Sequence, residues 1–171
     1  MRYIIILVLI GLGAAAFIYL TPKTLKNGDI VPTFELPTVS GKAFSIEKYE
    51  GKVLLLALFS IDDEQSRMLF SDFHFIQDQF SGDPAVRFVA IAVDGTPERV
   101  KLFLSHFRFQ GDVLVDDGRV IKEQFQCTSF PILYITNARH EIIYTINGFN
   151  REDIREVIPA LRRAKTEEPS G

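Results

Sequence analysis

The sequence predicts an α/β fold, with a central mixed sheet flanked by helices, preceded by one apolar segment long enough to cross a membrane. Three observations support this prediction. Apolar runs of strand length at residues 53–59 and 86–93 are each followed by a segment whose apolar residues recur at helical spacing. Two further runs, 132–136 and 141–146, are separated by a short polar turn, as in an antiparallel hairpin. The third observation is an uncharged stretch at residues 3–20.

Composition limits the possible function classes. The chain has 171 residues, of which 47% are hydrophobic, so it is long enough for one well-packed domain and an appendage. Its net charge is −3 and no run of basic residues occurs. A nucleic-acid-binding surface needs a positive patch, so we expect no binding to DNA or RNA.

The N-terminal stretch has the length of a membrane span. Its eighteen uncharged residues, 3–20, would extend roughly 27 Å as a helix, close to the hydrocarbon thickness of a bilayer. Arg2 precedes it, and Lys23 and Lys26 follow it, so flanking charge gives little guidance on orientation. We expect a signal anchor, that is a transmembrane helix over residues 1–20, which leaves a single-pass membrane protein with its domain on the extracytoplasmic side.

A cleaved signal peptide is the alternative. The small residues 14–16, all alanine, would be the processing site. The apolar run continues beyond them through residues 17–20, which favours a retained anchor. No cysteine lies nearby, so lipoprotein anchoring is excluded.

The remaining chain divides into a linker, a domain and a tail. Residues 21–28 are polar and form the linker, residues 29–165 form the domain, and residues 166–171 are expected to be a flexible tail. Within the domain, the uninterrupted apolar run at 53–59 is typical of a central strand buried on both faces.

Capping residues mark the predicted helices. Acidic residues open a helix over 62–80, and Thr96 followed by Pro97 begins the next one. A short strand at 112–116 leads to a short helix at 120–125. The last helix is capped by Asn150 with Asp153 three residues on, and Pro159 is expected to kink or shorten it.

Two segments carry a resemblance to a known family. Residues 28–37 read GDIVPTFELP, and a Gly-Lys pair follows at 41–42 and again at 51–52, directly before the first core strand. This pattern resembles the start of the TlpA/ResA branch of the thioredoxin-like superfamily, which is related to AhpC/TSA proteins. The resemblance covers about residues 28–164 and implies a thioredoxin-like fold and membrane-anchored thiol-disulfide oxidoreductase relatives.

The family's redox motif is missing. Its members carry Trp-Cys-x-x-Cys at the start of the long helix, and the resemblance places Ile61 at the tryptophan, Asp62 at the first cysteine and Gln65 at the second. Disulfide exchange needs a thiolate at the helix N-terminus and a second thiol one turn on. We expect Asp62 to cap the helix, with a ligand or partner contact as the alternative, and Gln65 to be an ordinary first-turn residue.

The proline loop of the family is retained in part. Residues 125–131, FQCTSFP, resemble the family's Y-x-V-x-G-x-P stretch, which implies that Pro131 is cis and faces the turn at Asp62. Ser129 stands at the glycine, and Phe130 stands where a small or β-branched residue is usual. The phenylalanine would fill part of the family's substrate groove, so Ile61, Phe130 and Pro131 are the candidate binding residues.

Cys127 is the only cysteine. It could be a monothiol nucleophile, form an intermolecular disulfide, or be a buried and inert small hydrophobic residue, and we expect the last. A peroxiredoxin reaction is excluded because residues 59–66 contain no proline, threonine or cysteine.

No cofactor or metal is expected. His74, His106 and His140 are isolated from one another and from other ligand-spaced residues. The acidic residues 62–64 could hold a cation, but consecutive residues at a helix start point in different directions, and solvated capping explains them better.

These observations lead to one main function and two alternatives. We expect a membrane-tethered, redox-inactive thioredoxin-like domain that binds a protein partner in the cell envelope, in a groove between residues 60–65 and 130–131. The first alternative is a thiol-disulfide oxidoreductase acting through Cys127. The second is a structural subunit of a membrane complex.

Overall fold

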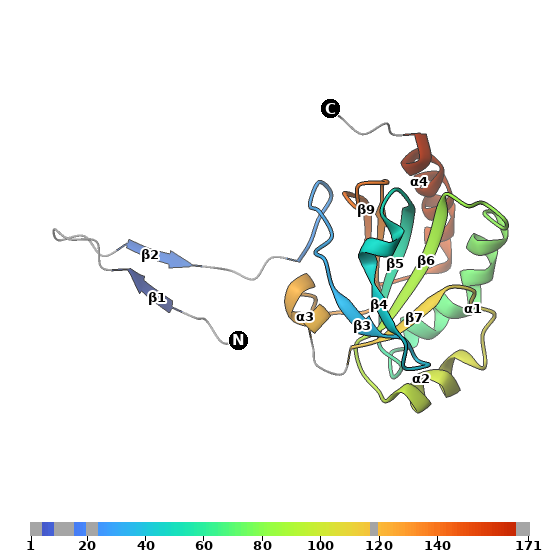
Figure 1. Ribbon diagram of the computed structural model, residues 1–171, viewed down its shortest axis with the longest axis horizontal. Helices are drawn as coiled ribbons and strands as arrows, with labels where there is room; N and C mark the ends of the chain where they lie inside the picture. The colour runs from blue at the N-terminus through green and yellow to red at the C-terminus, as the bar shows by residue number, and fades with distance from the viewer. Residues whose placement is uncertain (1–4, 9–15, 20–23, 117–119, 167–171) are drawn as a thin grey trace.

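A five-stranded mixed sheet forms the centre of the computed structural model, which describes residues 5–8, 16–19, 24–116 and 120–166 (Figure 1). The strand order is β7-β6-β5-β8-β9, with β5, β6 and β7 parallel and β8 antiparallel to both of its neighbours. The predicted mixed sheet and C-terminal hairpin are therefore confirmed. The strands are β5 (Val53–Phe59), β6 (Val86–Ala92), β7 (Asp112–Val115), β8 (Ile132–Thr136) and β9 (Ile142–Asn147).

Helices cover both faces of this sheet. One face carries α1, α2 and α4, whose apolar residues pack on β5 and β6, and the other carries α3 (Figure 1). The predicted caps are present, because Thr96 accepts from the Arg99 N–H and Asn150 forms a capping box with Asp153. The helices are α1 (Glu64–Asp78), α2 (Pro97–Leu104), α3 (Val120–Phe125) and α4 (Ile154–Thr166), the last preceded by the short 3-10 helix η2 (Arg151–Asp153).

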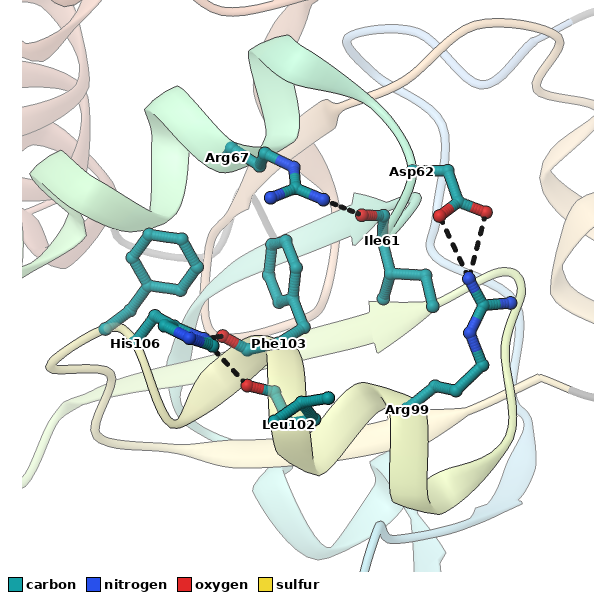
Figure 2. Close-up of a pocket in the computed structure, with 8 residues that line it drawn as sticks. Ile61, Asp62, Arg67, Arg99, Leu102, Phe103 and His106 are labelled. Atoms are coloured by element: carbon teal, nitrogen blue, oxygen red, sulfur yellow. Dashed lines mark hydrogen bonds and ion pairs between the residues drawn. The ribbon is translucent and has the colours of Figure 1, made fainter.

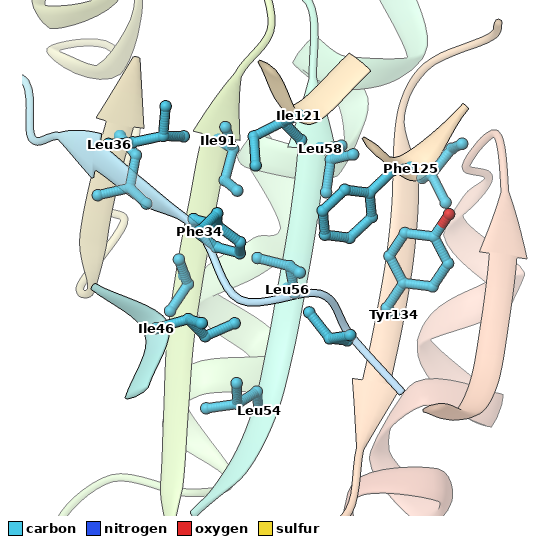
Figure 3. Packing of buried hydrophobic residues seen from close by; sticks show 14 of the residues in the cluster. Phe34, Leu36, Ile46, Leu54, Leu56, Leu58, Ile91, Ile121, Phe125 and Tyr134 are labelled. Carbon is cyan, nitrogen blue, oxygen red and sulfur yellow. The ribbon is translucent and has the colours of Figure 1, made fainter. Parts of the chain in front are cut away.

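Strand β5 shows why its sequence is apolar throughout. Alternate residues point to opposite faces, so Leu54, Leu56 and Leu58 enter the cluster beneath α3, together with Phe34 and Tyr134 (Figure 3). The intervening residues of β5 face the helices on the other side. No residue of β5 is more than 3% exposed, so the strand is buried on both faces as predicted.

A short N-terminal hairpin that the sequence pattern did not reveal completes the α3 face. It consists of β3 (Glu35–Pro37) and β4 (Ala43–Ser45), followed by the 3-10 helix η1 (Ile46–Tyr49). Its apolar residues enter the same cluster as Leu56. The Val39 N–H donates to the Val113 carbonyl, which ties the hairpin to the edge strand β7.

Two predictions about the chain ends differ from the structure. Of the predicted membrane helix over 1–20, the described residues form an antiparallel pair of strands, β1 (Ile5–Val8) and β2 (Ala16–Tyr19), and the others lie outside the described residues. In the described part of the chain, no helix combines the length and the apolar character that a bilayer crossing requires. Helix α4 continues past Pro159 to Thr166, so of the predicted kink or shortening, the shortening is wrong. Of the predicted tail, residues 167–171 also lie outside the described residues.

Candidate binding site at the head of helix α1

The turn between β5 and α1 is fixed by Asp94. Its carboxylate accepts from the Ser60 hydroxyl at 2.6 Å and from the Ile61 backbone N–H at 2.9 Å. Asp94 follows β6, which is parallel to β5, so the carboxyl ends of both strands meet at the same edge of the sheet. The sequence patterns considered above did not identify Asp94. An acidic residue directly after the neighbouring parallel strand was the signal that could have identified it.

Helix α1 is capped by Asp63 and not by Asp62. The Asp63 side chain accepts from the Ser66 backbone N–H at 2.6 Å, and the helix begins at Glu64. The prediction that Asp62 is the cap is therefore wrong by one residue. The error arose because three consecutive acidic residues, 62–64, satisfy the sequence rule for a helix start equally well, and only the backbone direction selects one of them.

The capping geometry also changes the position at which a redox pair would stand. A thiolate is stabilised at the N-cap, where the free N–H groups of the first turn point, and its partner stands three residues on. In this structure these two positions hold Asp63 and Ser66, and Ser66 is fully buried. Neither this pair nor the predicted pair, Asp62 and Gln65, contains sulfur.

The Asp62 side chain points toward α2. Both of its carboxylate oxygens lie near one guanidinium nitrogen of Arg99, at 3.0 and 3.3 Å (Figure 2). The side chains are 67% and 57% exposed, so the pair contributes at most about 1 kcal/mol to stability. In this structure the pair places the Asp62 carboxylate against α2.

Gln65 points the other way and contacts the chain next to the proline loop. Its side-chain oxygen accepts from the Phe149 N–H at 3.3 Å, and a Cβ added to Gly148 would lie 2.7 Å from that oxygen. The Gly148 N–H in turn donates to the Pro131 carbonyl at 2.8 Å. The structure thus links Gln65, rather than Asp62, to the segment of Pro131.

The proline loop contains the predicted cis bond, but its link to the head of α1 runs through Gly148 to Gln65 rather than to Asp62. The peptide bond between Phe130 and Pro131 is cis, which confirms the expectation from the resemblance. Pro131 is buried, while Phe130 is half-buried and packs against the cluster beneath α3. Ser129 beside it is exposed. Of the two predicted binding residues in this loop, Phe130 is therefore the one that solvent can reach.

Ile61, the third predicted binding residue, is only 4% exposed. It packs with Val100 and Phe103 between α2 and the sheet. A Cβ on Gly95, whose φ is +86°, would come within 2.6 Å of the Ile61 Cδ1 atom. The side chain of Ile61 thus fills the space that the glycine leaves, and its exposed edge forms part of a surface cavity described below.

Cys127 lies in the core. Its side chain is 1% exposed, and it belongs to the cluster of Leu56 and Tyr134 beneath α3. Helix α1 lies on the opposite face of the sheet. The expectation of a buried residue is confirmed, and a reaction at this thiol would first require the core to open.

The three histidines are dispersed as expected. His74 lies against the ring of Phe75 in a tilted arrangement, His106 contacts the Leu102 carbonyl, and His140 contacts the Tyr49 carbonyl. Among the described residues, no group of three or more potential ligands could hold a metal ion.

Comparisons with known proteins show the fold. No protein-family model matches the sequence, and no curated protein is significantly similar to it. A putative thiol:disulfide interchange protein DsbE from Chlorobium tepidum aligns over 82% of this chain and 99% of its own, with a TM-score of 0.75 and 18% identity. A putative protein disulfide isomerase from Bacteroides thetaiotaomicron aligns over 84% and 92%, with a TM-score of 0.75 and 16% identity.

A third similar structure is a secreted disulfide oxidoreductase of Mycobacterium tuberculosis that is homologous to DsbE. It aligns over 76% of this chain and 95% of its own, with a TM-score of 0.66 and 19% identity. These likenesses show a thioredoxin-like α/β fold, in agreement with the resemblance found in the sequence.

Proposed function

We propose that this thioredoxin-like chain is a redox-inactive domain of the TlpA/ResA type that binds a protein partner in the cell envelope. We further propose that its N-terminal apolar segment holds it at the membrane, with the domain on the extracytoplasmic side. The observation that carries the first proposal is the head of α1, where Asp63 occupies the N-cap and Ser66 the position three residues on.

Disulfide exchange needs sulfur atoms that can reach one another and the substrate. The thiolate attacks a disulfide, and a second thiol then resolves the mixed disulfide. Here the N-cap carboxylate can accept N–H groups but cannot exchange electrons, and the only cysteine is 1% exposed on the other face of the sheet. The buried position of Cys127 also argues against the alternative of a monothiol oxidoreductase.

The proposed contact surface lies beside the proline loop. Gln65 and Ser129 are exposed there, Phe130 is half-buried, and Gly148 connects the two sides through its contacts with Gln65 and Pro131. An aromatic side chain with a packed base and an accessible edge is the kind of residue that dominates protein interfaces. We therefore assign Phe130 as the main contact.

A pull-down with the full chain as bait tests the binding proposal. The same partner should be captured with and without reductant, and Phe130→Ala should reduce the captured amount about tenfold or more. The matched control is Phe75→Ala, because Phe75 is 53% exposed on α1 and is not part of the proline loop. Capture that disappears on reduction, or equal loss in both variants, would contradict the proposal.

Introducing two cysteines at the head of α1 tests whether the fold would support disulfide exchange if its redox cysteines were present. With dithiothreitol as the electron donor, the double variant Asp63→Cys/Ser66→Cys should catalyse insulin reduction: its two thiols become a disulfide as an insulin disulfide is reduced, and dithiothreitol regenerates them. The first thiol stands at the N-cap, where N–H groups lower its pKa. The unaltered chain should show only background activity. The control is Asp62→Cys/Gln65→Cys, with the same spacing but with the first thiol one residue before the cap. Equal activity of the two variants would refute the assigned positions, and turnover by the unaltered chain would refute the function.

The membrane anchor is proposed from the uncharged residues 3–20 alone. The extracytoplasmic side draws support from the secreted neighbour of Mycobacterium tuberculosis. A chain tagged at its C-terminus should sediment with membranes and resist extraction at high pH. Protease added outside the cytoplasmic membrane should remove the tag. Release of the chain at high pH would contradict the membrane anchor. Protection of the tag from protease would contradict its orientation.

A further inference from the structure

A surface cavity of about 360 Å³ opens between the head of α1 and helix α2, beside Asp62 (Figure 2). This volume lies at the lower end of the range typical of small-molecule sites. The lining combines cationic and apolar side chains with a single carboxylate: Ile61, Asp62, Arg67, Arg99, Leu102, Phe103, His106 and Phe107.

Arg67 is positioned as an anion-binding group. Its guanidinium lies 5.9 Å from the centre of the Phe103 ring and donates to the Ile61 carbonyl at 3.4 Å, a long hydrogen bond. Within the described part of the chain, no acidic side chain forms an ion pair with it. A guanidinium has five N–H donors, so Arg67 keeps most of its donors for a ligand.

Arg67 and Arg99 lie on opposite sides of Ile61 (Figure 2). The guanidinium of Arg99 is already bound by the Asp62 carboxylate. The Asp62 carboxylate shows which chemical group this wall accepts. Because that ion pair is more than half exposed, it is weak and exchangeable. Asp62 therefore acts as an internal competitor for any external carboxylate that approaches the two arginines.

The rest of the cavity is apolar. Phe103 forms part of its base, and Leu102 is 65% exposed, which makes it one of the few large hydrophobic residues left open to solvent in the described chain. His106 uses Nδ1 to donate to the Leu102 carbonyl at 2.9 Å, which leaves Nε2 for another partner. A ligand held by Arg67 would thus extend an apolar part over Leu102 and Phe103.

We propose that this cavity binds a carboxylate attached to a small apolar or aromatic group. The lining carries two arginines and one carboxylate, so its net charge is positive and favours an anion. The Phe103 ring at the bottom of the cavity favours an apolar group next to that anion. The site is separate from the proposed contact around Phe130, so it does not depend on the protein-binding function.

Titration of the full chain with 4-phenylbutyrate tests the proposal, with the solubilising buffer alone as the blank. Amide resonances of residues 61–62 and 99–107 should shift in NMR spectra, and 4-phenylbutanamide, the neutral analogue, should bind at least about tenfold more weakly because it loses a charge-assisted contact. Acetate, which has the charge without the apolar group, should also bind more weakly. Equal binding of acid and amide, or shifts confined to other parts of the chain, would overturn the proposal.

Two substitutions of opposite expected effect sharpen the test. Arg67→Ala should weaken binding about tenfold or more. Asp62→Ala should strengthen it about twofold to fivefold by releasing Arg99. Lys101→Ala is the control, because Lys101 is an exposed cation on α2 that does not line the cavity, and it should leave affinity unchanged. An Arg67→Ala variant that binds normally, or weaker binding by Asp62→Ala, would refute the assigned roles.

The carboxylate could belong to a free organic acid or to the C-terminus of a polypeptide that ends in an apolar residue. An acetylated tripeptide with C-terminal phenylalanine, prepared as acid and as amide, separates these sources. Tighter binding of the peptide acid than of 4-phenylbutyrate assigns the site to a polypeptide C-terminus. Tighter binding of 4-phenylbutyrate assigns it to a small acid, and failure of both acids to bind would overturn the proposal.

Discussion

Asp62 and Asp63 are adjacent acidic residues whose surroundings give them opposite roles. The Asp63 carboxylate accepts an N–H of the first turn of α1, whereas Asp62 points to Arg99 on another helix. A cap supplies a hydrogen-bond acceptor to a backbone N–H that has no partner within the helix. An exposed ion pair adds little stability, because water solvates both charges well when they are apart. Stability should therefore depend on Asp63 much more than on Asp62.

We predict that Asp63→Ala lowers the free energy of unfolding by about 1 kcal/mol, within a range of roughly 0.5–2 kcal/mol. Asp62→Ala should lower it less than Asp63→Ala does, by at most about 1 kcal/mol. Urea denaturation followed by circular dichroism measures both values. The reverse order of the two losses would mean that Asp62 is the cap.

A second residue-scale effect concerns Tyr49. Burial, followed by the hydrogen bond that its hydroxyl donates to the Asp112 carboxylate, raises the pKa of Tyr49 from 10.0 to about 12. Between these two pH values the unfolded chain releases this proton and the folded chain keeps it, so the unfolded state binds fewer protons. The stabilising contribution is therefore complete below pH 10 and is lost progressively as the pH rises toward 12.

We predict that the difference in unfolding free energy between the unaltered chain and Tyr49→Phe shrinks as the pH is raised above about 10. Urea midpoints measured at a series of pH values from neutral to alkaline give this difference. The comparison removes the contribution of titrating groups remote from Tyr49, which both chains share. A constant difference across the series would show that the tyrosine is not selectively protonated in the fold.

At the scale of elements, the pairing of β6 with β7 depends on a glycine. A Cβ on Gly111 would lie 2.4 Å from the backbone carbonyl oxygen of Phe88, although its φ is not in the left-handed region. Gly82 presents the opposite case, with a φ of +77° and no atom within 4 Å of its would-be Cβ. Substitution of Gly111 therefore tests the steric clash of a Cβ with the backbone, and substitution of Gly82 tests the cost of a positive φ.

We predict that Gly111→Ala destabilises the fold by about 1–3 kcal/mol, because a backbone atom cannot move aside as a flexible side chain can. Gly82→Ala should cost about 1–2 kcal/mol through its backbone conformation alone. Hydrogen exchange should show loosening of β7 only in the Gly111 variant. Unchanged protection of β7 in that variant would mean that the strands can separate without cost.

The candidate site lies where the ends of several strands meet at one edge of the sheet. Strands β5 and β6 run parallel, so Ser60 and Asp94 emerge at one edge and bond there. The antiparallel strand β8 begins at this edge, which brings the proline loop to the head of α1 through Gln65 and Gly148. The site is thus formed by three strand ends that are far apart in sequence.

For the whole molecule, the central sheet separates two apolar layers. Cys127 lies in the layer beneath α3, and the capped head of α1 lies on the other side. The thiol should therefore become accessible only when the layers come apart, and its reactivity reports on global unfolding.

We predict that Cys127 in the native chain reacts with a thiol reagent at least about a thousandfold more slowly than in the unfolded chain, as expected for a domain stable by 5 kcal/mol or more. The rate should rise with urea at the midpoint seen by circular dichroism. Fast labelling without urea would reveal local opening around Cys127 and would revive the monothiol alternative.

The sequence by itself determined the elements whose signals are local. The apolar run of β5, the Thr96 and Asn150 caps, the C-terminal hairpin and the absence of a redox cysteine pair could all be read from it, because each depends on residues within a few positions of one another. The cis bond before Pro131 followed from the family resemblance.

Only the tertiary structure decided which of several equivalent residues takes each role. Three consecutive acids can all begin a helix, and the path of the turn after β5 selected Asp63 for the cap and left Asp62 to Arg99. The same holds for Asp94 and Gln65, whose partners lie more than thirty positions away in the chain. Contacts over such separations depend on how the sheet and helices pack, which no local pattern of residues encodes.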